Sequence, residues 1–237
     1  MPSPRDVGVV IVAAGQGTRF GSDTPKQFIE IAGVPMLLRA IRPFARHPSV
    51  AHVAVVLRAA DAVAPPAWLL PHVGAMLSVV AGGAERTDSV AAGLAALPDG
   101  CHVVLVHDAA RPFVDAPLID RVIDGARAGH VVVPALPVTD TIKEMDAADP
   151  ERIARTVPRG PLRRVQTPQG FPRRVLEDAH AAAHARGQRE GRNVTDDAAL
   201  VEQMGGTVRI VAGDPRNLKV TTVEDLELAE YQARRGT

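Results

Sequence analysis

Short apolar runs rich in β-branched residues alternate with longer helix-like stretches along most of this chain. Runs of this length and composition are typical of strands buried on both faces. Segments that alternate in this way build a mostly parallel sheet with helices on both faces, so we predict an α/β fold. The predicted strands are Val7–Val12, Val53–Leu57, Met76–Val80, Val103–Val106, Val131–Ala135 and Val208–Val211. The predicted helices are Met36–Arg46, Asp88–Leu97, Pro117–Ala128, Arg173–Arg186, Asp196–Met204 and Glu224–Arg234.

One region, from Pro137 to Pro168, breaks this alternation because it is polar, charged and contains prolines. Within it, Thr139–Lys143 and Ile153–Val157 are predicted to form two short strands joined by an acidic turn. A hairpin this polar has no core of its own, so it needs another surface to pack on. We therefore expect one domain over residues 1–237, with a projecting β-arm at about 137–165.

The composition excludes several classes of function. Lys+Arg and Asp+Glu both number 27, so no global basic field exists to hold nucleic acid. The single cysteine, Cys101, excludes an intrachain disulfide and a multi-cysteine metal site. No apolar run reaches the ~18 residues of a membrane span, and no signal peptide is visible. We expect a cytoplasmic protein that binds neither nucleic acid nor membranes.

The first predicted strand runs into the turn Ala13–Arg19, with the sequence AAGQGTR, and Lys26 follows within the tripeptide PKQ. Backbone N–H groups in a Gly-rich turn after a strand can face an anion, and Arg19 and Lys26 add two cations. Such a turn suits a polyphosphate, although an ordinary strand-to-helix turn with solvated cations is the alternative. Phe20 stands where a dinucleotide fingerprint requires its third glycine, which argues against a dinucleotide-dependent oxidoreductase.

Ligands in open α/β sheets bind beyond the carboxyl ends of the strands, so residues that follow each strand are site candidates. Gly82 and Gly83 follow one strand, with Ser89 shortly after. Glycines let a base approach the backbone closely, and a hydroxyl could read its edge. The alternative is an ordinary turn into a helix. Lys219 follows a further strand that we expect near Leu218.

Asp108 follows the apolar run Val103–Val106, with His107 between them. A carboxylate at a strand end beside a phosphate site suits a magnesium ligand. A loop cap or an ion pair with Arg111 is the alternative for Asp108. We interpret His107 as a histidine bonded to nearby backbone rather than as an acid–base catalyst. Pro43 is expected to kink the first helix or end it early.

The motifs AAGxGxR, PKQ, GGxERxDSV, HDAARP, DTIK, TPQ and NLKVT occur in this order across almost the whole chain. Together they resemble the 2-C-methyl-D-erythritol 4-phosphate cytidylyltransferases of the non-mevalonate isoprenoid pathway, which have a Rossmann-like nucleotidyltransferase fold. The resemblance implies in-line attack of methylerythritol phosphate on the α-phosphorus of CTP, with Mg²⁺ as cofactor. Pyrophosphate leaves, a CDP-linked alcohol forms, and no covalent enzyme intermediate is expected.

The resemblance also implies a role for each matching residue. The catalytic cations would be Arg19 and Lys26, and Asp108 would bind Mg²⁺. The nucleotide would contact Ala13, Ala14, Gly15, Gly17, Gly82, Gly83, Ser89, Asp108 and Ala109. The acceptor would contact Arg111, Thr141, Arg159, Thr167 and Lys219. In this family the arm, which here carries Thr141 and Arg159, reaches the neighbouring subunit of a homodimer.

Two other functions remain open at this point. The same chemistry could act on another short polyol phosphate, such as ribitol 5-phosphate, because the motifs separate these acceptors poorly. A non-catalytic nucleotide-binding protein could share the fold, although intact Arg19, Lys26 and Asp108 argue against it. The chain departs from the family pattern at Ala84, which is acidic in some relatives, and at Asp197, where glutamate is common.

Overall fold

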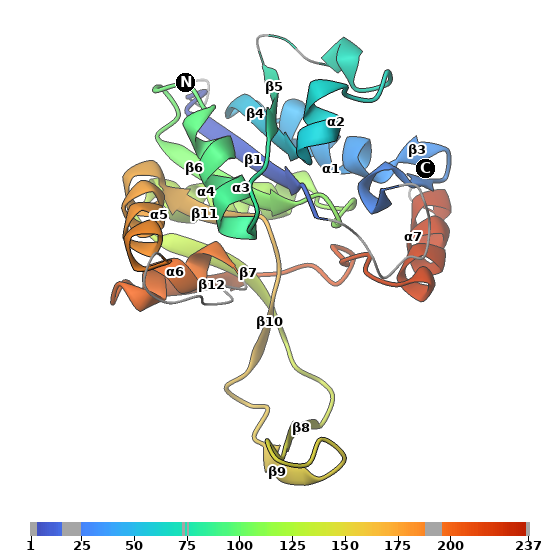
Figure 1. The fold of residues 1–237 in the computed structure, drawn as a ribbon, viewed down its shortest axis with the longest axis vertical. Coiled ribbons are helices and arrows are strands. Elements are labelled where there is room, and N and C mark those ends of the chain that lie inside the picture. The colour runs from blue at the N-terminus through green and yellow to red at the C-terminus, as the bar shows by residue number, and fades with distance from the viewer. Residues whose placement is uncertain (1–3, 16–24, 73, 75, 188–195, 236–237) are drawn as a thin grey trace.

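The computed structural model describes residues 4–15, 25–72, 74, 76–187 and 196–235, and its centre is a mixed sheet of eight strands (Figure 1). These strands are β1 (Val7–Ala13), β4 (Val50–Leu57), β5 (Leu77–Ala81), β6 (Val103–Asp108), β7 (Val131–Pro137), β10 (Arg163–Val165), β11 (Gln169–Pro172) and β12 (Val208–Ala212). Their order is β10-β7-β11-β6-β1-β4-β5, with β12 paired to β7. The neighbours β5, β4, β1 and β6 are parallel, so their carboxyl ends share one edge.

Helices cover both faces of the sheet, as the alternating pattern predicts. One apolar core contains residues of α1 (Met36–Ala45) and α4 (Ala116–Arg127). The other contains residues of α3 (Arg86–Ala95), α5 (Arg173–Gly187) and α6 (Asp197–Gln203). The remaining elements are α2 (Ala59–Val63), α7 (Val223–Arg235), short 3₁₀ turns at Lys26–Phe28 and Leu70–His72, and the small hairpin of β2 (Glu30–Ile31) and β3 (Val34–Pro35).

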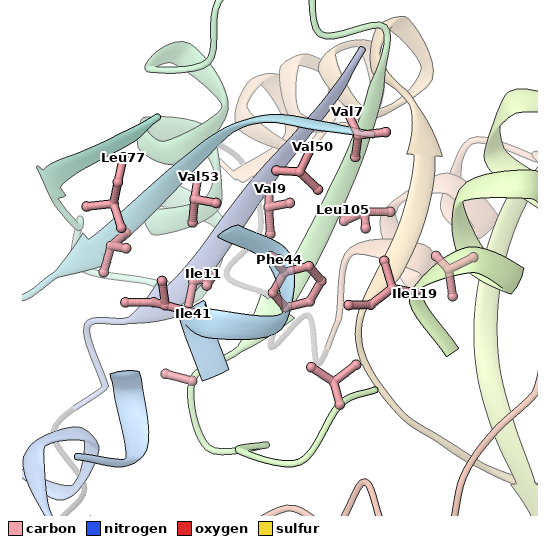
Figure 2. Packing of buried hydrophobic residues seen from close by; sticks show 14 of the residues in the cluster. Val7, Val9, Ile11, Ile41, Phe44, Val50, Val53, Leu77, Leu105 and Ile119 are labelled. Atoms are coloured by element: carbon pink, nitrogen blue, oxygen red, sulfur yellow. The ribbon is translucent and has the colours of Figure 1, made fainter. Parts of the chain in front are cut away.

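Strand β1 runs through the middle of the protein and is buried on both sides. Val9 and Ile11 lie in the core that contains Phe44 of α1, and Figure 2 shows these side chains together. Val10 belongs to the opposite core, with Val90 of α3. Burying side chains of this size contributes about 1.5–3 kcal/mol each. The continuous apolar run of β1 is therefore explained by two helical layers rather than one.

The structure corrects two details of the sequence-based description. Helix α1 continues through Pro43 to Ala45, so the expectation that this proline ends the helix early is wrong. Pro43 removes one hydrogen bond from this helix, but Phe44 beside it is fully buried in the core, and this packing stabilises the last turn. Leu218 is not part of a strand. Thr222 and Asp225 form a capping box at the start of α7, with reciprocal bonds of 3.3 and 2.9 Å.

The predicted pair of short strands is present as β8 (Ile142–Met145) and β9 (Ile153–Val157), an antiparallel hairpin separate from the main sheet. Figure 1 shows this hairpin at the far end of an arm that leaves β7 and returns in β10. Polar pairs join its strands: Lys143 Nζ donates to Thr156 Oγ1 over 2.7 Å. Met145 and Ile153 are 45% and 53% exposed, so the hairpin has no apolar core.

A buried hydrogen-bonded chain fixes the loop that follows β6. His107, which has no exposed surface, lies 3.0 Å through Nε2 from the Arg111 carbonyl oxygen and 3.1 Å through Nδ1 from Thr167 Oγ1. A carbonyl only accepts, so Nε2 carries the proton and Nδ1 accepts from the Thr167 hydroxyl. Thr167 Oγ1 in turn accepts the backbone N–H of Asp108 over 3.0 Å. Burial keeps this ring neutral by lowering the pKa of His107 to about 4, and the histidine is bonded to nearby backbone as expected for a structural residue.

The segment that carries Lys219 is held by side chains rather than by a strand ladder. Arg111 Nη1 donates to the Asn217 carbonyl over 2.9 Å, and Asn217 Nδ2 donates to the Thr167 carbonyl over 2.8 Å. The Val220 N–H also donates to the Ala110 carbonyl over 2.8 Å. These bonds place the segment beside the end of β6 although it has no regular secondary structure.

Burial lowers the pKa of His107 from 6.5 to about 4, which makes stability depend on pH. Below pH 6.5 the unfolded chain binds a proton that the folded protein does not, so the free energy of unfolding falls as the pH approaches 4. We expect His107→Phe to destabilise the protein by about 2–3 kcal/mol near neutral pH, because Thr167 and Arg111 lose a buried partner. Between about pH 7 and pH 5 the difference from wild type should shrink by about 2 kcal/mol in urea unfolding. A difference that stays constant with pH would show that His107 does not titrate in this way.

Candidate active site

The parallel register brings several predicted site residues to one edge of the sheet. Val12 is paired with Asp108, and Ala13 with Leu57 of β4. The Ala109 N–H donates to the Val12 carbonyl over 3.1 Å, and the Gly82 N–H donates to the Leu57 carbonyl over 2.7 Å. The segments after β1, β5 and β6 are thereby adjacent. They contain Ala13, Ala14, Gly15, Gly82, Gly83, Asp108 and Ala109 of the predicted nucleotide site.

Gly82 and Gly83 are required by close packing of the turn before α3. A Cβ on Gly82 would lie 2.7 Å from the Ala14 Cβ and 2.6 Å from Ser89 Oγ. A Cβ on Gly83 would lie 2.3 Å from the Asp88 Cβ. Ser89 is buried, and its hydroxyl donates to the Glu85 carbonyl over 3.1 Å. The ordinary-turn interpretation therefore accounts for both glycines, and the role of Gly82, Gly83 and Ser89 in holding cytosine stays a prediction.

At this edge the carboxylate of Asp108 faces two cations. Its Oδ2 lies 2.8 Å from Lys219 Nζ, and its Oδ1 lies 3.7 Å from Arg86 Nη2. Burial alone would raise the pKa of this carboxyl, but the Lys219 ammonium and the Arg86 guanidinium outweigh it and lower the pKa to about 2. Asp108 is thus ionised at any physiological pH. The Arg111 guanidinium is bonded to the carbonyls of Asn217 and Val165 instead, which disfavours the simple ion-pair alternative.

A magnesium ion fits this edge only together with a nucleotide. Mg²⁺ prefers oxygen ligands and is usually held by one or two carboxylates, water and substrate phosphates. Asp108 provides one ionised carboxylate. Among the described residues, no group of three His, Cys, Asp or Glu side chains could hold a metal by itself. The remaining ligands of such an ion would have to be phosphate oxygens and water.

Arg86 is a residue of this edge to which the sequence analysis assigned no role. It begins α3, directly after Glu85, whose N–H is accepted by Asp88 Oδ2 over 3.0 Å. Its Nη1 donates to Asp197 Oδ2 over 2.6 Å while Nη2 faces Asp108. Burial would lower the pKa of Arg86, but Asp197 and Asp108 raise it. The available signal was its place in the GGxERxDSV motif, immediately after the paired glycines.

The predicted acceptor residues fall into two groups. Thr167 and Lys219 both contact Asp108, through its backbone N–H and its carboxylate respectively. Arg111 is 9% exposed and donates to backbone carbonyls beside them. Thr141 and Arg159 are exposed on the arm, where Arg159 Nη1 donates to the Thr139 carbonyl. Within the described part of a single chain, no hydrogen bond or ion pair joins Thr141 or Arg159 to Asp108.

The two predicted catalytic cations are placed unequally. Lys26 is partly exposed at the first position of the 3₁₀ turn Lys26–Phe28. Arg19 and Gly17 lie outside the described residues.

In the described part of the chain, no helix is long and apolar enough to cross a membrane.

Comparison with protein families matches almost the whole chain to one family. Residues 7–235 match the family model described as "IspD: 2-C-methyl-D-erythritol 4-phosphate cytidylyltransferase". A 2-C-methyl-D-erythritol 4-phosphate cytidylyltransferase from Rhodococcus jostii is 43% identical, and the match covers 97% of this chain and 96% of that protein. A bifunctional enzyme IspD/IspF from Solidesulfovibrio magneticus is 47% identical over 94% of this chain. The match covers only 56% of that longer protein.

Solved structures show the same relationship. The crystal structure of 2-C-methyl-D-erythritol 4-phosphate cytidylyltransferase from Thermus thermophilus superimposes with a TM-score of 0.79 at 38% identity, covering 97% of this chain and 99% of that one. The α/β fold with a mostly parallel sheet is the fold of that enzyme. The chain therefore belongs to the 2-C-methyl-D-erythritol 4-phosphate cytidylyltransferases, the cytidylyltransferases of the non-mevalonate isoprenoid pathway.

Proposed function

We propose that the edge formed by the ends of β1, β5 and β6 is where this chain carries out the reaction of its family. A phosphate oxygen of methylerythritol phosphate attacks the α-phosphorus of CTP, and a new P–O bond forms as the bond to pyrophosphate breaks. The observation that carries this proposal is Asp108. It is an ionised carboxylate at the end of β6, held between Lys219 and Arg86 and directly beside the turn that follows β1.

Such a reaction requires neutralised charge and correct placement rather than an enzyme nucleophile. Lys26 and Arg19 would stabilise the negative charge that develops on the α-phosphate, and the backbone of Ala14 and Gly15 would line the triphosphate. Among the described residues, a Cβ on Gly15 would meet no atom within 4 Å. Bound Mg²⁺ would supply further charge neutralisation, with Asp108 as its protein ligand.

Lys219 and Thr167 would hold the acceptor beside Asp108. The Lys219 side chain is 46% exposed, so its ammonium is accessible while it pairs with Asp108. Thr167 is fixed by its bonds to His107 and to the Asp108 backbone. A fixed hydroxyl next to an accessible cation suits a phosphorylated polyol, which presents both hydroxyls and a dianion.

The arm would complete the site of a neighbouring subunit. It carries Thr141 and Arg159 beside a polar hairpin with exposed Met145 and Ile153, and within the described residues the hairpin strands β8 and β9 pair with each other and with no other strand. A second copy of this chain would cover these apolar side chains and receive the two acceptor residues. We therefore propose a homodimer in which each active site contains residues of both chains.

The choice of acceptor is tested by measuring pyrophosphate release. Purified protein with CTP and Mg²⁺ should release pyrophosphate with 2-C-methyl-D-erythritol 4-phosphate at a rate far above that with ribitol 5-phosphate. The expected preference reflects a site built for one carbon skeleton, where a misplaced polyol loses hydrogen bonds to buried groups. Preference for ribitol phosphate would contradict the proposed acceptor. Absence of turnover with both would favour a non-catalytic nucleotide-binding protein.

The balance of charge at Asp108 is tested by Lys219→Met, which keeps the length of the side chain but removes its charge. We expect the pKa of Asp108 to rise above its present value of about 2, because burial is then no longer opposed by the Lys219 ammonium, its strongest counterweight. Side-chain ¹³C NMR of labelled aspartate reports this titration directly. Turnover should fall by about a hundredfold. Lys143→Met on the arm is the matched control and should leave the Asp108 titration unchanged.

Sharing of active sites is tested by mixing two inactive variants, Lys26→Ala and Arg159→Ala. If Arg159 acts in the neighbouring site, half of the randomly reassociated dimers contain one intact site, and about a quarter of wild-type activity returns. Mixing Lys26→Ala with Lys219→Met is the control. This mixture should restore no activity, because Lys26 and Lys219 would enter each site from the same chain, so every mixed dimer lacks one of them in each site. A mixture of the first pair that is no more active than either variant would overturn the shared site.

A further inference from the structure

A row of charged and polar groups connects Asp108 to the helices behind the site. Arg86 Nη2 faces Asp108 over 3.7 Å, and Arg86 Nη1 donates to Asp197 Oδ2 over 2.6 Å. The other oxygen of Asp197 lies 3.1 Å from His180 Nε2. Asp197 has no exposed surface, and His180 is 8% exposed. The row therefore begins at Asp108 on the sheet edge, passes through Arg86 of α3 and Asp197 of α6, and ends at His180 of α5.

The direction of the Arg86 guanidinium depends on Asp197. The backbone of Arg86 is fixed at the start of α3, but an arginine side chain has about 2 kcal/mol of rotamer entropy to lose before its head group is fixed. The short bond to the immobile carboxylate of Asp197 provides this restraint. The second terminal nitrogen of the planar guanidinium then faces Asp108.

The length of the Asp108 contact is also informative. At 3.7 Å, Arg86 contributes positive charge without closing a short hydrogen bond on Asp108 Oδ1. Asp197 takes the short bond instead. An arginine held in this way lowers the pKa of Asp108 and leaves one of its oxygens able to bind another cation.

We propose that Asp197 is a positioning residue for cytidylyl transfer. It holds the Arg86 guanidinium at a fixed place beside Asp108, and His180 fixes the carboxylate of Asp197. This inference rests on the proposed role of Asp108 in the reaction. The competing explanation is a salt bridge that only joins α3 to α6, because breaking a buried pair by itself costs about 3–5 kcal/mol.

A double-mutant cycle between Arg86→Gln and Asp197→Asn separates these explanations. Each single variant should lower kcat/KM for CTP by about tenfold or more. If Asp197 acts through Arg86, adding Asp197→Asn to Arg86→Gln should change kcat/KM by less than about twofold. If Asp197→Asn lowers kcat/KM by the same factor in both backgrounds, the positioning role is overturned. Thermal unfolding of all four proteins identifies any loss that comes from unfolding.

Two further variants keep the test decisive where Asp197→Asn folds poorly. Asp197→Glu keeps the carboxylate and should retain more kcat/KM than Asp197→Asn. His180→Phe removes one bond to Asp197, and its smaller loss of kcat/KM should also vanish in the Arg86→Gln background. A loss from His180→Phe that persists there would count against the proposal. Asp108→Asn is measured in parallel, because full activity of that variant would refute the role of Asp108 itself rather than the positioning of Arg86.

Discussion

The position of Asp108 at the edge of the sheet depends on the hydroxyl of Thr167. It donates to His107 Nδ1 and accepts the backbone N–H of Asp108, so one side chain joins β6 to the segment between β10 and β11. His107 can accept only while it is neutral, and burial keeps it neutral by lowering its pKa to about 4. A histidine buried against Phe44, with ring centroids 4.9 Å apart, thereby controls where Asp108 is held.

Charged side chains are concentrated at this edge, although the chain as a whole has no net charge. The chain has as many acidic as basic residues, yet Lys219 and Arg86 both face a single carboxylate. Asp197, behind Arg86, accepts the short hydrogen bond of this guanidinium, and the contact of Arg86 with Asp108 is longer, at 3.7 Å. A site assembled in this way can receive polyphosphate without a large basic surface that would also attract nucleic acid.

The features that could be predicted from the sequence are those that depend on residues close together along the chain. The strands and helices follow from local periodicity, and Asp108 follows from its place after a buried strand. A strand at Leu218 was wrong because the polar groups of that segment bond to Arg111, Gln166 and Ala110 from distant parts of the chain. The pair of Arg86 and Asp197 is separated by 111 residues, so no spacing rule in the sequence could indicate it. Pro43 shows the opposite limit, since its lost hydrogen bond is tolerated in a helix whose next residue, Phe44, is fully buried in the core.

In the proposed homodimer, the arm would contribute residues to the active site of the other subunit. A polar two-stranded hairpin is marginal alone, and here the arm that ends in it carries two residues proposed for the acceptor, while the other proposed residues lie at the edge of the main sheet. If the arm is ordered only on a partner, then subunit association, hairpin order and the acceptor side of the site form together. Dilution would then weaken acceptor binding before it affects CTP, because the residues proposed for the nucleotide all lie within one chain.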